Sequence, residues 1–241
     1  MRKINLIALT VIAVFVFASA LLAQADLKIP AETFDFGIMP QNAKVTGGYW
    51  LFSNGPDTLK ITEVKPGCGC TKAPLKTNTL APGDSAFLEI SFSSNQYKSR
   101  VHKTIKINSN AAEPIRNLAL TGTVQIQMDS TKPVIIRPYK LDISQFGAKA
   151  REQMKFTLEN ISEQDLEWSM VYYPRDYFEV KLPDKIKAGK SVEGILKVRP
   201  EYTNAEFEQS FTIEFNDADH TRFTIPVTRT LRNISATSGS N

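Results

Sequence analysis

Residues 85–93, Ser-Ala-Phe-Leu-Glu-Ile-Ser-Phe-Ser, decide the fold class of this 241-residue chain. Leu88, Ile90 and Phe92 alternate with Glu89 and Ser91, so the apolar side chains share one face of an extended strand. The same period of two recurs in short runs at 101–107, 118–120, 166–170, 178–182, 211–215 and 223–227. Short alternating runs of this kind predict an all-β protein built from sandwiches of antiparallel strands.

Turn-forming sequences separate these runs. The clearest are Asn54-Gly55-Pro56-Asp57, Ala81-Pro82-Gly83-Asp84 and Asn216-Asp217-Ala218-Asp219. Only residues 148–154 have a helical pattern, and that segment is too short to change the fold class.

The strand pattern also occurs twice. Phe36-Gly37 resembles Phe146-Gly147, residues 80–85 align with 186–191, and residues 106–109 align with 214–217. The offsets of 106 to 110 residues equal one immunoglobulin-like module. We therefore predict two tandem immunoglobulin-like domains, at 26–125 and 132–232. The short linker at 128–133 predicts that they lie end to end with restricted hinging.

The first 25 residues have the features of a cleavable signal peptide. A positive start at Arg2 and Lys3 precedes an apolar run, and Ala23-Gln24-Ala25 forms a small-x-small cleavage signature. The alternative is a membrane anchor, but residues 6–23 span only 18 positions, at the lower limit for crossing a bilayer. We expect cleavage before Asp26, no lipid anchor, and a periplasmic or secreted protein. Residues 233–241 contain little to bury and are predicted to be disordered.

Charge argues against two classes of partner. The formal net charge of +4 falls to +2 when Arg2 and Lys3 are removed, because 4 − 2 = 2. The remaining basic residues are scattered, so we expect neither a nucleic-acid nor an anionic-membrane partner. No other run is as long and apolar as residues 6–23, so we expect no stable membrane span after cleavage. The expected partner is another envelope or extracellular protein; the sequence does not determine the oligomeric state.

Both cysteines lie in the motif Pro66-Gly67-Cys68-Gly69-Cys70-Thr71. In an oxidising compartment two such thiols favour a disulfide, but an extended strand would place the Cα atoms about 6.6 Å apart, at the upper limit for a bridge. Gly67 and Gly69 allow a tighter path, and a small strained ring would be redox-active. A reduced pair would instead bind Cu(I), whereas zinc would need His102 or another chain. A buried structural role remains a third interpretation.

Other reactive residues fit structural roles. Gly83-Asp84-Ser85 resembles part of a serine-hydrolase motif, but it precedes a strand and has the counterpart 189–191, so a turn explains it. His102 is out of phase with the apolar residues of its run, and His220 lies in an expected hairpin. We therefore predict that the protein is not an enzyme and has no resident cofactor.

Several motifs of the first domain resemble one exported bacterial family, domain of unknown function 1573. They are Phe34-Asp35-Phe36-Gly37, residues 52–55, residues 67–71, residues 80–85 and Leu120-Thr121-Gly122-Thr123. This family is similar to the immunoglobulin-like domains of the major sperm protein and hydin type. The resemblance implies fold and export, and no established activity. The second domain lacks the cysteines, since residues 172–177 occupy their place, and is interpreted as a diverged copy.

Two functional hypotheses follow. The first is a non-enzymatic binding or scaffolding protein of the cell envelope, because immunoglobulin-like sandwiches offer loops and strand edges to protein partners. The second is a redox-active or copper-handling protein that uses Cys68 and Cys70. In either case the candidate residues are those around the cysteine motif: Gly67, Cys68, Gly69, Cys70, Thr71 and Lys72.

Overall fold

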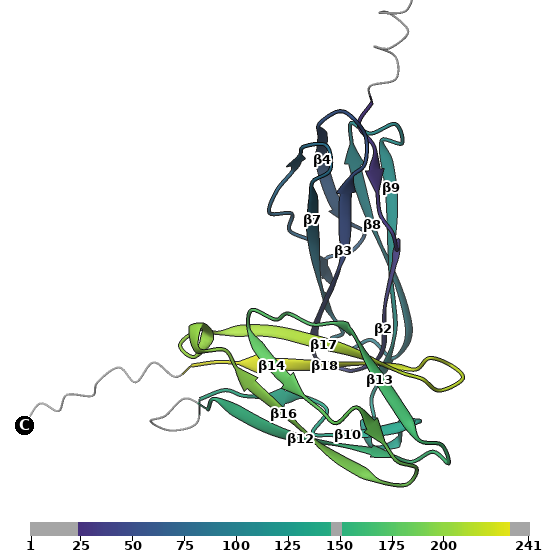
Figure 1. Ribbon diagram of the computed structural model, residues 1–241, viewed down its shortest axis with the longest axis vertical. Helices are drawn as coiled ribbons and strands as arrows, with labels where there is room; N and C mark the ends of the chain where they lie inside the picture. Colours follow the sequence, from purple (N-terminus) through teal and green to yellow (C-terminus); the bar gives the residue numbers. More distant parts are fainter. Residues whose placement is uncertain (1–23, 146–150, 232–241) are drawn as a thin grey trace, which may run out of the picture.

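The structure, a computed structural model, describes residues 24–145 and 151–231, which form two all-β sandwiches (Figure 1). Nine strands form the first: β1 (Leu27–Lys28), β2 (Thr33–Pro40), β3 (Lys44–Ser53), β4 (Leu59–Pro66), β5 (Thr71–Lys72), β6 (Thr79–Leu80), β7 (Ser85–Ser93), β8 (Ser99–Ser109) and β9 (Ile115–Gln125). Nine more form the second: β10 (Val134–Arg137), β11 (Leu141–Asp142), β12 (Gln153–Asn160), β13 (Leu166–Tyr172), β14 (Phe178–Lys181), β15 (Lys185–Ile186), β16 (Ser191–Val198), β17 (Phe207–Phe215) and β18 (Arg222–Arg229). Two short 3-10 helices, Met128–Ser130 and Pro200–Tyr202, lie in connections.

The two sandwiches have the same strand order. One sheet of the first domain runs β1-β3-β7-β5 and its equivalent in the second runs β10-β12-β16-β14. The opposing sheets contain β2-β9-β8-β4-β6 and β18-β17-β13-β15, and β11 pairs with β18 in parallel as β2 pairs with β9. The prediction of two tandem immunoglobulin-like domains is confirmed.

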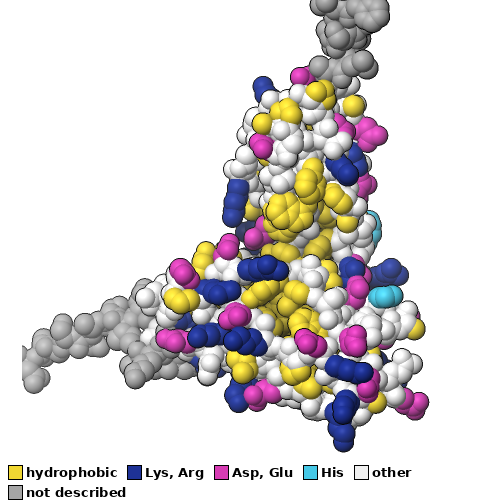
Figure 2. All heavy atoms as spheres, in the orientation of Figure 1, with side chains coloured by type: hydrophobic (Ala, Val, Ile, Leu, Met, Phe, Trp, Pro, Cys, Tyr) yellow, Lys and Arg dark blue, Asp and Glu magenta, His cyan; other side chains and the backbone are white. Residues whose placement is uncertain are grey.

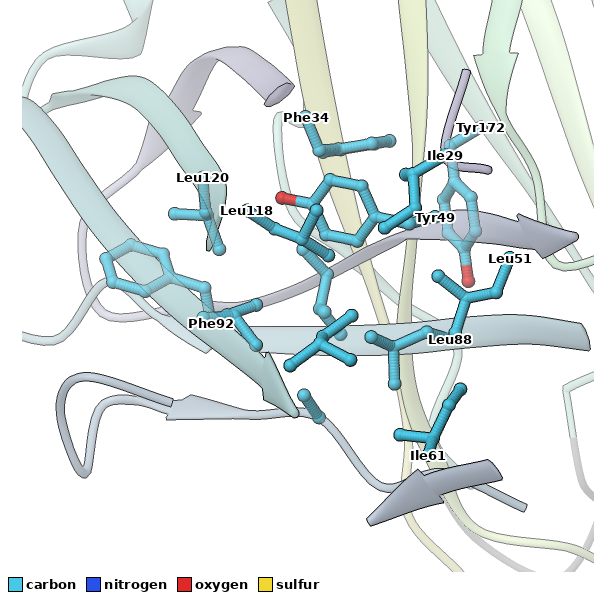
Figure 3. Close-up of a cluster of buried hydrophobic side chains, with 14 of the residues drawn as sticks. Ile29, Phe34, Tyr49, Leu51, Ile61, Leu88, Phe92, Leu118, Leu120 and Tyr172 are labelled. Atoms are coloured by element: carbon cyan, nitrogen blue, oxygen red, sulfur yellow. The ribbon is translucent and has the colours of Figure 1, made fainter. Parts of the chain in front are cut away.

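Each domain buries its own hydrophobic core. In the first, the inward residues of β7 (Leu88, Ile90 and Phe92) are fully buried, as the alternation predicts. They pack against β3 and the opposing sheet, where Leu51 and Leu118 lie (Figure 3). A second cluster around Phe156, Phe178, Phe211 and other residues fills the other domain.

One local prediction is wrong. Residues 148–154 do not form a helix where they are described, because Gln153 and Met154 belong to β12, which pairs with both β10 and β16. Pairing of Gln153 with Lys197 and of Met154 with Leu196 in β16 overrides a weak local preference for helix. Residues 1–23, 146–150 and 232–241 lie outside the described residues, and with them most of the predicted signal peptide, the Phe146-Gly147 repeat and the tail. Within the described parts no helix has the length and hydropathy needed to span a bilayer.

The domains do not lie end to end, contrary to the prediction from the short linker. β2 of the first domain pairs in parallel with β18 of the second at Ile38 and Phe223, which joins the two opposing sheets into one ten-stranded sheet. Figure 1 shows the lower end of the first domain standing on β17 and β18, which run across it. Linker length alone does not fix domain orientation; the side chains where the domains meet do.

Polar contacts at this junction are buried and specific. Ser210 on β17 accepts a hydrogen bond from the Thr46 N–H (2.7 Å) and donates one to the Thr46 carbonyl (3.0 Å). The Ser210 N–H in turn donates to the Thr46 hydroxyl at 2.9 Å. The Thr224 hydroxyl donates to the Phe36 carbonyl at 2.6 Å. Buried hydrogen bonds across a junction fix the arrangement of the domains, because separating the domains would break them.

Aromatic rings from both domains pack together on one side of the same junction. Tyr172, at the end of β13, packs into the core cluster of the first domain and meets Phe34 edge-on, with ring centroids 6.0 Å apart (Figure 3). On its other side it stacks on Phe87 at 6.1 Å. Burial raises the pKa of the Tyr172 hydroxyl, with a further contribution from the negative charge of Glu89. In the first domain the cysteine loop follows β4. In the second domain the equivalent strand is β13, and Tyr172 at its end contacts the first domain instead.

Candidate functional site

The cysteine motif forms a tight corner between β4 and β5. Cys68 and Cys70 are joined by a disulfide, and their Cα atoms are 5.3 Å apart, closer than an extended strand would place them. The chain achieves this because Gly69 and Cys70 form a turn rather than continuing the strand. The disulfide that the sequence left open as one of three interpretations is therefore present in the structure.

The two glycines of the motif have different roles. The Gly67 N–H donates to the Thr104 carbonyl at 2.8 Å, and a Cβ at Gly67 would lie 2.9 Å from the Thr104 hydroxyl oxygen. Gly67 is thus held against β8. Gly69 has no atom within 4 Å of the position a Cβ would take, so it faces open space.

Thr71 and Lys72 lie on opposite sides of β5. Thr71 is buried, and its hydroxyl oxygen is 3.5 Å from Cys68 Sγ and 3.9 Å from Cys70 Sγ. It supports the disulfide from within and does not offer its side chain to a partner. Lys72 is exposed, so of these two candidates only Lys72 is available for binding.

A polar groove of about 460 Å³ opens beside this loop, at the junction of the two domains. From the first domain it is lined by Gly69, Cys70, Lys72 and the outward residues of β7, Ser91 and Ser93. The remaining lining residues are Asn42, Ala43, Lys44 and Asn95 from the first domain and Lys140, Glu208, Pro226 and Thr228 from the second. This volume is within the range of pockets that hold small ligands or short peptide segments.

Basic side chains outnumber acidic ones in the groove lining. Lys44 pairs with Glu208 at 3.2 Å, and both side chains are partly exposed, so the pair contributes little to stability. Lys140 Nζ donates to the Asn42 carbonyl at 2.9 Å, and burial lowers the pKa of its ammonium group. Figure 2 shows basic side chains where the second domain meets the first. The groove thus has more positive than negative charge.

The disulfide at the lip of this groove adds little to global stability. It closes a loop of only three residues, for which the chain-entropy relation gives about 1.6 kcal/mol, below the usual range for a disulfide. The matching loop of the second domain folds without one, between β13 and β14. Neither observation favours a purely structural role for the bridge.

The other candidate residues lie apart from the groove. Ser85 begins β7 after a turn in which the Asp84 carboxylate accepts the Ala81 N–H at 3.1 Å. His102 is exposed on β8, and His220 sits in the β17–β18 turn, 3.7 Å from the Glu214 carboxylate. Among residues 24–145 and 151–231 no three His, Cys, Asp or Glu side chains gather as a metal site would require.

Sequence reasoning missed most of the groove, because only Gly69, Cys70 and Lys72 of its lining were candidate residues. Lys44, Lys140 and Glu208 are far apart in the chain, and each reads as an ordinary surface residue. They come together only because β3 of the first domain packs on β17 of the second. No local pattern could have indicated this, since the contact depends on how the domains dock.

Comparisons with known proteins assign no activity to this chain. No curated protein matches the chain in sequence. Among solved structures, PapD-like domain 7 of human CEP192 is similar at 8% identity and a TM-score of 0.37, covering 44% of this chain and 89% of that one. A protein of unknown function from Porphyromonas gingivalis W83 is similar at 15% identity and a TM-score of 0.35, covering 85% and 99%.

A third similar structure is WR4, a major sperm protein family member of C. elegans, at 11% identity and a TM-score of 0.30, covering 41% of this chain and 97% of that one. In sequence, residues 27–124 match one family, and these residues form the first sandwich with its disulfide loop. The family that residues 27–124 match is the one described as Protein of unknown function (DUF1573).

Proposed function

We propose that this protein is a non-enzymatic binding protein of the cell envelope that holds a partner in the groove between its two domains. The observation that carries the proposal is the groove itself, which both domains line and which the cysteine loop borders. The buried Thr46–Ser210 contacts fix the domains relative to each other, so the groove is preorganised. A preorganised site loses less free energy on binding than one that must assemble.

Blocking the groove tests this proposal. Gly69→Phe places a large side chain at its lip without a steric clash, because nothing lies within 4 Å of that position. Lys28→Phe on β1 is the control, since it adds the same ring away from the groove lining. Each protein, fused to an affinity tag, is used to capture partners from envelope extracts. We expect the wild type and the control to retain the same partner and Gly69→Phe to lose it. Equal capture by all three would overturn the proposal.

A second candidate function is thiol–disulfide exchange at Cys68 and Cys70, favoured by the disulfide at the groove lip. A thiolate of a partner dithiol would attack Cys70 Sγ, breaking the bridge and releasing Cys68 as a thiolate. The second thiolate of the partner would then attack the mixed disulfide. The partner ends oxidised to a disulfide, and Cys68 and Cys70 end reduced, so two electrons pass from partner to protein.

Thiol titration separates these functions. The purified protein is treated with a dithiol peptide and its free thiols are counted under native conditions, with and without Cu(I). Two reactive thiols at low peptide concentration would support exchange, and protection of those thiols by Cu(I) would support copper handling instead. A bridge that the peptide does not reduce, or reduced thiols that take up no Cu(I), would exclude exchange or copper handling respectively.

A further inference from the structure

Two lysines in the groove have no acidic partner among residues 24–145 and 151–231. Lys72 on β5 makes no ion pair there, and the Lys140 ammonium bonds only to the neutral carbonyl of Asn42. Lys44, by contrast, is paired with Glu208 at 3.2 Å. The groove therefore contains three ammonium groups and one carboxylate, an excess of two positive charges.

The rest of the lining is suited to a polar anion. Ser91, Ser93 and Thr228 carry hydroxyl groups, and Asn42 and Asn95 carry amides, all of which can donate hydrogen bonds. Lys140 is partly removed from water without a counter-charge, which destabilises the empty groove. A bound carboxylate would supply that counter-charge, and partly desolvated ion pairs are stronger than exposed ones.

A short strand edge lies beside these charges. Among the described residues β5 is the last strand of its sheet and pairs with β7, at Thr71 with Phe92 and Lys72 with Ser91. The Thr71 N–H is bonded to the Cys68 carbonyl at 3.3 Å, so this edge offers the Thr71 carbonyl as an acceptor. An extended segment can add to such an edge through main-chain hydrogen bonds while its side chains occupy the adjacent groove. This edge favours a peptide over a small acid.

We propose, building on the binding function above, that the groove binds an extended acidic segment of a partner protein. Its carboxylates pair with Lys72 and Lys140, and one of its main-chain N–H groups donates to the Thr71 carbonyl at the outer edge of β5. The Cys68–Cys70 loop forms one border of the groove.

Fluorescence anisotropy with a labelled peptide tests the proposal. The probe is a short run of Asp residues flanked by Gly, and its control is the same peptide with Asn. The proteins are the wild type, Lys72→Gln, the double variant Lys72→Gln/Lys140→Gln, and Lys28→Gln, which removes one charge on distant β1. We expect the double variant to bind the Asp peptide about fivefold more weakly or worse, Lys72→Gln to show part of this loss, and Lys28→Gln to bind as the wild type does.

The outcomes separate this inference from the proposed function. An Asn peptide that binds as well as the Asp peptide, or a Lys28→Gln variant that loses as much as Lys72→Gln, would overturn the acidic assignment. Free glutarate that competes at the same concentration as the peptide would assign the carboxylate site to small acids and overturn the peptide. If Gly69→Phe abolishes partner capture while the lysine variants capture normally, the groove function stands and this inference fails.

Discussion

At the scale of single residues, the cysteine loop depends on what each glycine touches. Gly67 lies against Thr104, with its N–H bonded to the Thr104 carbonyl, whereas Gly69 faces open space. Neither glycine has a positive φ, so steric contact and not backbone conformation distinguishes them.

Alanine at each position gives opposite results. Gly67→Ala forces its new methyl group against the Thr104 side chain and should destabilise the fold by about 1–3 kcal/mol, the usual cost of overpacking. Gly69→Ala should change the free energy of unfolding by less than about 0.5 kcal/mol, as surface substitutions usually do. Urea denaturation of both variants measures this, and equal stability of the two would contradict the contact.

Among the elements, β2 departs most from regular geometry. Its register shifts between Asp35 and Ile38, and Gly37 in that interval has φ +62°. The Asp35 carboxylate supports this bulge by accepting the Gly37 N–H at 3.1 Å. The bulge bends β2 toward β18, so that one element belongs to both domains.

Gly37→Ala should disrupt the bulge in β2 and lower the free energy of unfolding. A Cβ there would lie 2.3 Å from the Arg222 carbonyl oxygen, in addition to the strain of a positive φ. Gly83→Ala is the matched control, since Gly83 has φ +85° but open space around it. We expect the control to cost about 1–2 kcal/mol and Gly37→Ala clearly more, measured by denaturant unfolding. A smaller loss for Gly37→Ala would show that β2 does not need the close approach to β18.

The turn between β15 and β16 should make stability depend on pH. The Asp165 carboxylate accepts the Ala188 N–H at 2.9 Å and pairs with Lys185 at 3.2 Å; these contacts, the first foremost, lower its pKa below the ordinary 3.8. Its contribution is present above the unfolded pKa and is lost as pH falls through the lower folded pKa. The stability difference between wild type and Asp165→Asn should therefore shrink in acid. A difference independent of pH would contradict the shift.

For the whole molecule, the decisive feature is that the sandwiches around two hydrophobic cores share one continuous sheet. The Ser210 hydroxyl serves both the N–H and the carbonyl of Thr46 on β3, so a side chain of one domain replaces a missing strand partner in the other. Such contacts couple the domains more tightly than their short linker requires.

Ser210→Ala should loosen this coupling. It leaves the buried Thr46 N–H without its partner, at a cost of about 1–3 kcal/mol. Ser169→Ala, at an exposed position on β13, is the control and should have little effect. Calorimetry should show the domain transitions drawing apart in Ser210→Ala and not in the control. Unchanged transitions would show that the domains fold independently of this contact.

The alternating apolar residues determined the fold class, because a period of two places them on one face of a strand whatever their neighbours are. Leu88, Ile90 and Phe92 are buried as that pattern predicts. The repeat predicted two domains of one topology, and the cysteine motif located one wall of the candidate site. Local pattern also misled at 148–154, where pairing of Met154 in β12 prevailed over helical preference.

Only the tertiary structure decided how the domains meet and what their junction contains. The Thr46–Ser210 contact spans 164 residues, and Lys140 lies far in sequence from Lys72, so no local pattern relates them. Burial of Thr71 and exposure of Lys72 likewise depend on what packs against β5. Strand periodicity is a property of neighbouring residues, whereas the groove arises from surfaces that become adjacent only when two folded domains dock.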